Sequence, residues 1–160
     1  MALALPTPAN PGATPASKAH ARAHRRWQSG REHAEREQWP QAATAFEQAT
    51  ALHADAAYAL AAAHALIKAG RASDAVRRAR HIRQRDPRAG LAYTLESHAL
   101  LGLGRPGDAL ECLQALPSDA PRDNDHHVAL AVALQRCGRH NEAIRAFFDA
   151  LALKMDDAVS

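Results

Sequence analysis

Ten histidines are the residues of this sequence whose chemistry could support metal binding or catalysis. His20 and His24 are four residues apart, which would place both on one helix face at the spacing of two metal ligands. No third ligand is evident nearby, so we interpret them as solvated side chains of the first helix. His126 and His127 are adjacent and would point to different faces. The sequence therefore predicts no metal site and no cofactor.

Five arginines between residues 77 and 85 would give one helix a basic surface, and phosphate contacts need only lysine and arginine. This helix has no aromatic residue for base stacking. The second half of the chain would also repel a nucleic acid, since residues 1–88 carry a net charge of +7 and residues 89–160 a net charge of −4. We interpret the arginines as a solvated face, and a nucleic-acid partner is disfavoured.

Nucleophilic chemistry has no support in the motifs of the chain. It has no glycine-rich phosphate loop, no Gly-x-Ser-x-Gly elbow and no His-Glu-x-x-His helix, and its serines have no paired base. Cys112 and Cys137 fall in helical patterns and are predicted to be free thiols, buried or half-buried, in a reducing compartment. The sequence predicts no catalytic residues and a chain that is not an enzyme.

The helices that position these side chains are marked by a six-residue motif, Gly-Arg-x-x-acid-Ala, which we call the phrase. It begins at Gly70, Gly104 and Gly138. Its copies start 34 residues apart, and a fixed period of roughly 20–50 residues indicates a repeat architecture. Each glycine is expected to end one helix in a left-handed conformation. Each acid then lies in the first turn of the next helix, where the helix dipole favours it.

The composition favours helices, because alanine dominates the apolar residues and aromatic residues make up only 4%. Residues 1–16 contain four prolines and no charge, which predicts a disordered Ala/Pro-rich tail that buries nothing. The start lacks the basic region of a secretory signal, and no run approaches 18 apolar residues. We expect a cytoplasmic protein that does not bind a membrane.

Small and bulky residues recur in phase with the phrase. Small residues stand early in the second helix of each pair: Ala42, Ala75, Ala109 and Ala143. Bulky residues follow four positions later in three of the pairs: Phe46, Leu113 and Phe147. Small residues recur in the first helices: Gly30, Ala63, Ser97 and Ala131. In these positions the chain resembles the tetratricopeptide repeat (TPR) family, whose unit is a helix-turn-helix of 34 residues.

The resemblance implies an all-α fold, a right-handed superhelix of about four TPR-like units. We place the TPR-like domain at 17–157, with units at about 23–55, 56–89, 90–123 and 124–157. Residues 158–160 would be a tail or the start of a further repeat. The first unit matches least well, because Glu37 stands where the other units have glycine.

The resemblance also implies that the first helices of the units line a concave groove, which would bind a peptide or a partner protein. The predicted groove residues are Trp27, Arg31, Leu60, His64, Ile67, Thr94, His98, Leu101, Val128, Val132 and Gln135. Some family members hold an acidic peptide terminus in a carboxylate clamp, but the corresponding positions here lack its residues. His64 and His98 are equivalent in successive units and, with Arg31, could contact an acidic or polar peptide. The alternative, that they pack against their neighbours, is favoured.

The last helix carries two apolar stripes. Ala143, Phe147 and Ala150 form one, and Ile144, Phe148 and Leu151 form the other. One stripe can face its partner helix, while the other would be left bare because no polar capping helix follows. A bare apolar patch usually marks an interface. We therefore predict an open-end interface at Ile144, Phe148 and Leu151 through which the chain self-associates.

These observations favour a protein-protein interaction scaffold or adaptor. A first alternative is the N-terminal TPR module of a longer enzyme, since similar repeats precede sulfotransferase or glycosyltransferase domains in bacterial proteins, and the alanine, arginine and histidine bias is typical of a high-GC bacterium. A second alternative is a secretion chaperone, although those chaperones tend to be acidic.

Overall fold

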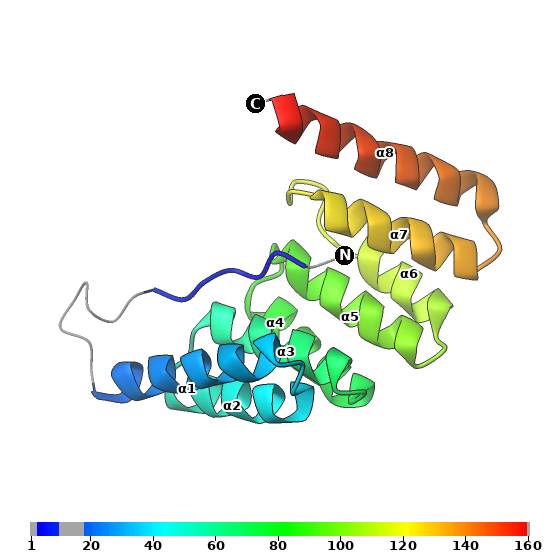
Figure 1. Ribbon diagram of the computed structural model, residues 1–160. Coiled ribbons are helices and arrows are strands. Elements are labelled where there is room, and N and C mark those ends of the chain that lie inside the picture. Colours follow the sequence, from blue (N-terminus) through cyan, green and yellow to red (C-terminus); the bar gives the residue numbers. More distant parts are fainter. Residues whose placement is uncertain (1–2, 10–17, 160) are drawn as a thin grey trace. The chain divides into compact units, whose positions relative to one another are not determined.

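A computed structural model describes residues 3–9 and 18–159 of the chain, and all regular secondary structure in these ranges is α-helical (Figure 1). The helices follow one another in four pairs: α1 (Lys18–Glu35) and α2 (Trp39–Leu52), α3 (Ala56–Lys68) and α4 (Ala72–Arg85), α5 (Gly90–Gly102) and α6 (Pro106–Gln114), α7 (Asn124–Arg136) and α8 (His140–Val159). The predicted all-α fold of TPR-like helix pairs is confirmed. The chain divides into two compact units, Met1–Ala79 and Arg80–Ser160, with the boundary inside α4.

The repeated phrase forms the turn within three of the pairs. Gly70, Gly104 and Gly138 have φ angles of +77°, +70° and +78°, which is the left-handed conformation that the phrase predicts. In each turn the amide of the following arginine donates to a carbonyl five residues earlier, as from Arg71 to Leu66 at 2.8 Å. This hydrogen bond closes the end of the first helix.

The arginine and the acid of each phrase also form an ion pair, which the sequence pattern alone did not predict. Arg105 Nε lies 2.5 Å from Asp108, and one guanidinium nitrogen of Arg139 lies 2.6 Å from Glu142. Arg71 makes the same contact with Asp74 at 2.7 Å. The acid of the phrase therefore has two favourable interactions, with the helix dipole and with the arginine three residues before it.

In the first compact unit, Met1–Ala79, α1 packs against α2, and α2 packs against α3. The core is built largely from alanine, with Ala42, Ala49 and Ala62 fully buried. Gly30 permits close contact in this unit, because a Cβ atom at Gly30 would lie 2.6 Å from the ring of Phe46. Glu37 has a φ angle of +57° in the turn between α1 and α2, where the other pairs use glycine.

In the second unit, α5 packs against α6 and α7, α6 packs against α7, and α7 packs against α8. Its core contains larger side chains, among them Leu95, Leu100 and Leu113. Glu96 is also buried, with only 1% of its side chain exposed, and its carboxylate lies 2.7 Å from Nε of both Arg80 and Arg83. An ion-pair cluster is therefore part of this core.

Two features differ from the sequence prediction. Helix α8 continues to Val159, so residues 158 and 159 belong to this helix rather than to a tail or a further repeat. Of the predicted disordered tail, residues 1–2 and 10–16 lie outside the described residues, as does Ser17. Residues 3–9 have no helix or strand, yet Pro8 is buried, which contradicts the expectation that the tail buries nothing.

Candidate functional site

The groove residues predicted for the first unit lie on α1 and α3. Trp27 and Leu60 are 7% and 6% exposed, so both belong mainly to the core. The guanidinium carbon of Arg31 lies 5.2 Å from the centre of the Trp27 ring, and Arg31 also pairs with Glu35 at 3.6 Å. His64 and Ile67 are half-buried. Arg31 is thus the one member of this group with a largely exposed side chain.

The groove residues predicted for the second unit lie on α5 and α7. Thr94 is 1% exposed, and its hydroxyl donates to the carbonyl of Gly90 at 3.3 Å. Gln135 is exposed, and the remaining four residues are half-buried: His98, Leu101, Val128 and Val132. Thr94, Leu60 and Trp27 cannot present a contact surface in this structure, because they are buried. The binding role of the other predicted groove residues stays a prediction.

The histidines are mostly engaged with other rings. The ring of His64 lies edge-on to Trp39, with centroids 5.8 Å apart, which agrees with the favoured interpretation that this histidine packs against neighbours. His20 stacks on His53 at 4.2 Å, so it is not simply solvated. His126 is buried, and burial, followed by the charges of His127 and Arg122, lowers its pKa to about 4. Over residues 3–9 and 18–159, no three His, Cys, Asp or Glu side chains are placed to hold a metal ion.

The cysteines differ from each other. Burial, with the nearby charge of Glu96, raises the pKa of Cys112 to about 12, so its thiol stays protonated at neutral pH. Cys137 is exposed, which contradicts the prediction that it is buried or half-buried. It directly follows the last residue of α7, Arg136, where the apolar pattern of that helix no longer applies.

The predicted open-end residues of α8 are exposed. Ile144, Phe148 and Leu151 have exposed fractions of 53%, 66% and 52%, and Met155 continues the same stripe at 61%. The buried stripe of α8 consists of Ala143, Ala146 and Ala150 rather than the predicted set with Phe147, which is 41% exposed. We call the five exposed residues, Ile144, Phe147, Phe148, Leu151 and Met155, the α8 apolar face.

Three of the five arginines of helix α4, Arg77, Arg80 and Arg85, are exposed, in keeping with a solvated face, but four of the five also have ion-pair partners. Arg80 and Arg83 hold the buried Glu96, Arg77 pairs with Asp74, and Arg78 lies 3.5 Å from Glu47. These internal partners reduce the positive charge that α4 offers to a phosphate backbone.

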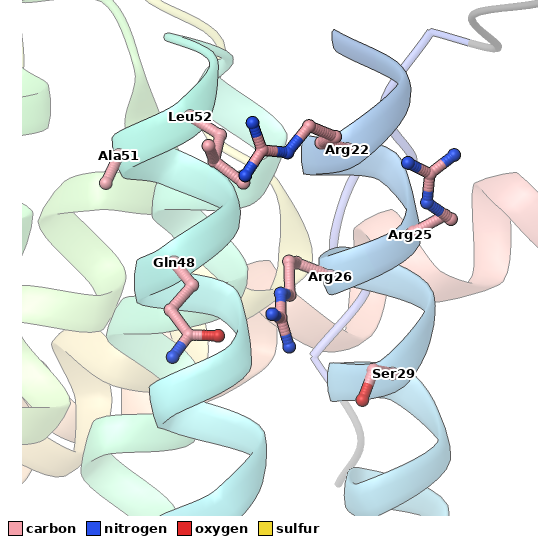
Figure 2. Close-up of a pocket in the computed structure, with 7 residues that line it drawn as sticks. All are labelled: Arg22, Arg25, Arg26, Ser29, Gln48, Ala51 and Leu52. Carbon is pink, nitrogen blue, oxygen red and sulfur yellow. The ribbon is translucent and has the colours of Figure 1, made fainter. Parts of the chain in front are cut away.

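A basic groove lies between α1 and α2, and the sequence did not predict it. It has a volume of about 500 Å³ and is lined by Arg22, Arg25, Arg26, Ser29, Gln48, Ala51 and Leu52 (Figure 2). A spacing of four, three and four residues, from Arg22 through Arg26 and Ser29 to His33, could have indicated this polar helix face.

The sequence over residues 20–157 matches the family described as bacterial transcriptional activator domain. The chain belongs to this family. A comparison with curated proteins finds no match. The family assignment covers all four helix pairs, because residues 20–157 extend from α1 to α8.

Solved structures similar to this bacterial transcriptional activator domain are TPR proteins. TTC0263 of Thermus thermophilus has 22% sequence identity and a TM-score of 0.73, over 82% of this chain and 74% of that chain. MamA from Desulfovibrio magneticus RS-1 has 19% identity and a TM-score of 0.70, over 89% and 80%. The Arabidopsis OM64 TPR domain has 19% identity and a TM-score of 0.65, over 73% and 98%. These similarities confirm the predicted TPR fold.

Within residues 3–9 and 18–159 of this family member, no helix combines the length and the apolar character that crossing a bilayer requires.

Proposed function

We propose that this chain is a protein-interaction module of a bacterial transcription regulator and that it self-associates through the α8 apolar face. The family description supports the link to transcriptional activation, and the TPR fold supports a role in protein binding. The observation that carries the proposal is the exposure of five large apolar side chains on one helix. Monomeric proteins rarely leave a contiguous apolar patch of this kind uncovered.

The spacing of the α8 apolar face favours another helix as the occupant. Ile144, Phe148, Leu151 and Met155 follow at intervals of four, three and four residues. This is the apolar spacing at which two helices pack along a shared seam. The opposite side of α8 has the buried alanines of its own hairpin, so a second helix can approach the exposed side without disturbing that packing.

The charges along α8 favour a second copy in antiparallel orientation. Arg145 and Glu142 offset each other near the beginning of the helix, whereas Asp156 and Asp157 outnumber Lys154 near its end. Parallel pairing would bring the two acidic ends together, whereas antiparallel pairing would bring the acidic end of one copy towards Arg145 of the other and would also align the two helix dipoles favourably. It would place Ile144 opposite Met155, and Phe148 opposite Leu151, of the second copy.

The exposed area is sufficient for a small dimer interface. An aromatic side chain can bury about 150–250 Å², so five large side chains near half exposure leave on the order of 500 Å² per copy. Two copies then reach the roughly 1,000 Å² that a specific interface needs. We expect a reversible dimer in the micromolar range rather than a permanent one.

Sedimentation velocity over a range of protein concentrations tests this proposal. The wild-type chain should shift from a mass of 17.2 kDa towards twice that value as its concentration rises. The double variant Phe148→Glu/Leu151→Glu should stay monomeric, because carboxylates would be buried in the seam. Arg136→Glu changes the charge by the same amount at an exposed site outside α8 and should dimerise like the wild type. A wild-type chain that stays monomeric at every concentration would contradict self-association.

The cellular location of the protein, and whether the chain is part of a longer protein, stay predictions. We propose a cytoplasmic site of action, in keeping with a role in transcription. The proposals of a longer enzyme and of a secretion chaperone remain alternatives without a specific structural observation in their favour.

A further inference from the structure

The groove between α1 and α2 has the chemistry of an anion-binding site. Arg22 and Arg26 extend from α1 into the space between the helices, where Gln48 and Leu52 of α2 face them (Figure 2). Arg25 adds a third guanidinium group on the outer side of α1. None of the residues that line this groove is acidic.

None of the four acidic side chains of the hairpin lines the groove. Two of them have partners: Glu35 pairs with Arg31, and Glu47 lies 3.5 Å from Arg78 and 4.0 Å from Arg71. The other two, Glu32 and Glu37, are exposed and line no part of the groove. Among the described residues, no ion pair within 4.0 Å involves Arg22, Arg25 or Arg26. Their charges are therefore available to an external anion, and an arginine fork matches a carboxylate well.

A second hollow extends the basic groove along the same two helices. Its volume is about 480 Å³, and it shares Arg26, Ser29 and Gln48 with the first hollow. It continues to His33 on α1 and to Gln41 on α2, again without an acidic residue in its lining. From Arg22 to His33 the helix rises about 16 Å, which is the length of roughly five residues of extended peptide.

The lining changes along the groove in a way that fits a peptide. The arginines cluster at one end, while Ser29, Gln41 and Gln48 offer neutral donors and acceptors for a peptide backbone farther along. Ala45, Ala51 and Leu52 supply apolar surface beside them. No Phe, Tyr or Trp ring, on which nucleic-acid bases stack best, is present in either lining.

We propose that the groove between α1 and α2 binds an extended acidic segment of a partner protein, with Arg22 and Arg26 contacting its carboxylates. This proposal rests on the proposed role as a protein-interaction module and names the chemistry of one partner. It involves none of the residues of the α8 apolar face, so the two sites can be tested separately.

Fluorescence anisotropy with two labelled hexapeptides tests the site, one with three glutamates among glycines and one with glutamines in their place. The full chain should bind the glutamate peptide at least about tenfold more tightly than the glutamine peptide in dilute buffer, and less tightly as salt is added. Arg22→Gln/Arg26→Gln should lose about tenfold in affinity. Arg85→Gln/Arg136→Gln removes the same charge at two exposed positions and should lose less than about twofold.

Several outcomes would overturn the proposal. They are equal losses in the two double variants, equal binding of the two peptides, and tighter binding of a single-stranded oligonucleotide of the same charge than of the glutamate peptide. Thermal unfolding should show that both double variants remain folded. If dimerisation persists while glutamate specificity is absent, the acidic-segment proposal fails alone; a monomeric chain that binds the glutamate peptide specifically would instead contradict only self-association.

Discussion

Gly30 packs directly against the ring of Phe46, and an added methyl group would not fit between them. A Cβ atom at residue 30 would lie 2.6 Å from two ring carbons of Phe46, whose ring is 5% exposed and has little room to move. Gly30→Ala should therefore lower the free energy of unfolding by about 1–3 kcal/mol, despite the higher helix propensity of alanine. Urea unfolding would measure this change.

A second glycine provides the control for this substitution. At Gly107, in the first turn of α6, an added methyl group would meet nothing within 4 Å, and the φ angle is not positive. Gly107→Ala should therefore be neutral or stabilising by up to about 1 kcal/mol. If both variants were equally stable relative to the wild type, the close-packing role assigned to Gly30 would be wrong.

His126 makes stability depend on pH. Burial, reinforced by the positive charges of His127 and Arg122 and opposed by Asp123, lowers its pKa to about 4, whereas an unfolded histidine titrates near its usual 6.5. Between these values the unfolded chain binds a proton that the folded chain does not. Stability should therefore fall as the pH falls from about 6.5 to 4, by on the order of 1–3 kcal/mol from this group.

Unfolding free energies of wild type and His126→Gln between pH 7 and pH 4 would isolate this contribution. The variant should have a shallower slope, because the titrating group is removed, while His81→Gln, at an exposed position, should keep the wild-type slope. A slope in His126→Gln that is as steep as in the wild type would rule out His126 as the cause.

Two arginines of helix α4 pair with a buried carboxylate on α5. Glu96 on α5 is 1% exposed, and its two oxygens accept hydrogen bonds of 2.7 Å from Arg80 and Arg83. Arg83 also lies over the ring of Tyr93, with its guanidinium carbon 5.3 Å from the ring centre. The second half of α4 is thus attached to α5 by a network rather than by apolar packing alone.

Replacing Glu96 with glutamine should destabilise the protein. Glu96→Gln keeps the size of the side chain but leaves two guanidinium groups without their buried counter-charge, at a cost of about 1–3 kcal/mol when the partial exposure of both arginines is considered. Chemical denaturation of Glu96→Gln and of the exposed matched control Glu111→Gln would measure it. An equal stability of the two variants would show that the network contributes little.

Among the elements, the helices and their turns were largely predictable from the sequence. Gly70, Gly104 and Gly138 are local signals, because a left-handed residue ends a helix whatever lies around it. The continuation of α8 through residues 158 and 159 was missed, although residues 151–159 contain no glycine or proline to stop a helix. The first turn shows that glycine is not obligatory there, because Glu37 adopts a φ angle of +57°.

The candidate sites were only partly predictable, because exposure depends on contacts from other elements. The bare stripe on α8 could be predicted, since one helix with two apolar stripes and one neighbour leaves one stripe uncovered. Leu60 and Thr94 were assigned to a surface from their register in the repeat, but both are buried. To predict the basic groove between α1 and α2, one must know which faces of the two helices pack side by side. Residue spacing on one helix does not give this information.

In the molecule as a whole, the two candidate surfaces have different chemistry. The first unit offers three arginines along the α1/α2 groove that pair with no acidic side chain in the described part of the chain, and the second offers the α8 apolar face. A dimer formed through α8 would carry two copies of the basic groove. A partner with two acidic segments would then bind more tightly than one with a single segment, as expected for a bivalent module.

Disulfide trapping of α8 tests the central claim, self-association through this helix, most directly. In a Cys137→Ser background, chains with Ile144→Cys should be mixed with chains with Met155→Cys, while the buried Cys112 thiol, with its pKa of about 12, stays unreactive. Antiparallel pairing predicts rapid formation of the mixed disulfide. Each variant alone should form little, because its two cysteines would lie about 16 Å apart along the helix pair. No cross-linking in the mixture, or equally fast cross-linking of each variant with itself, would contradict the account.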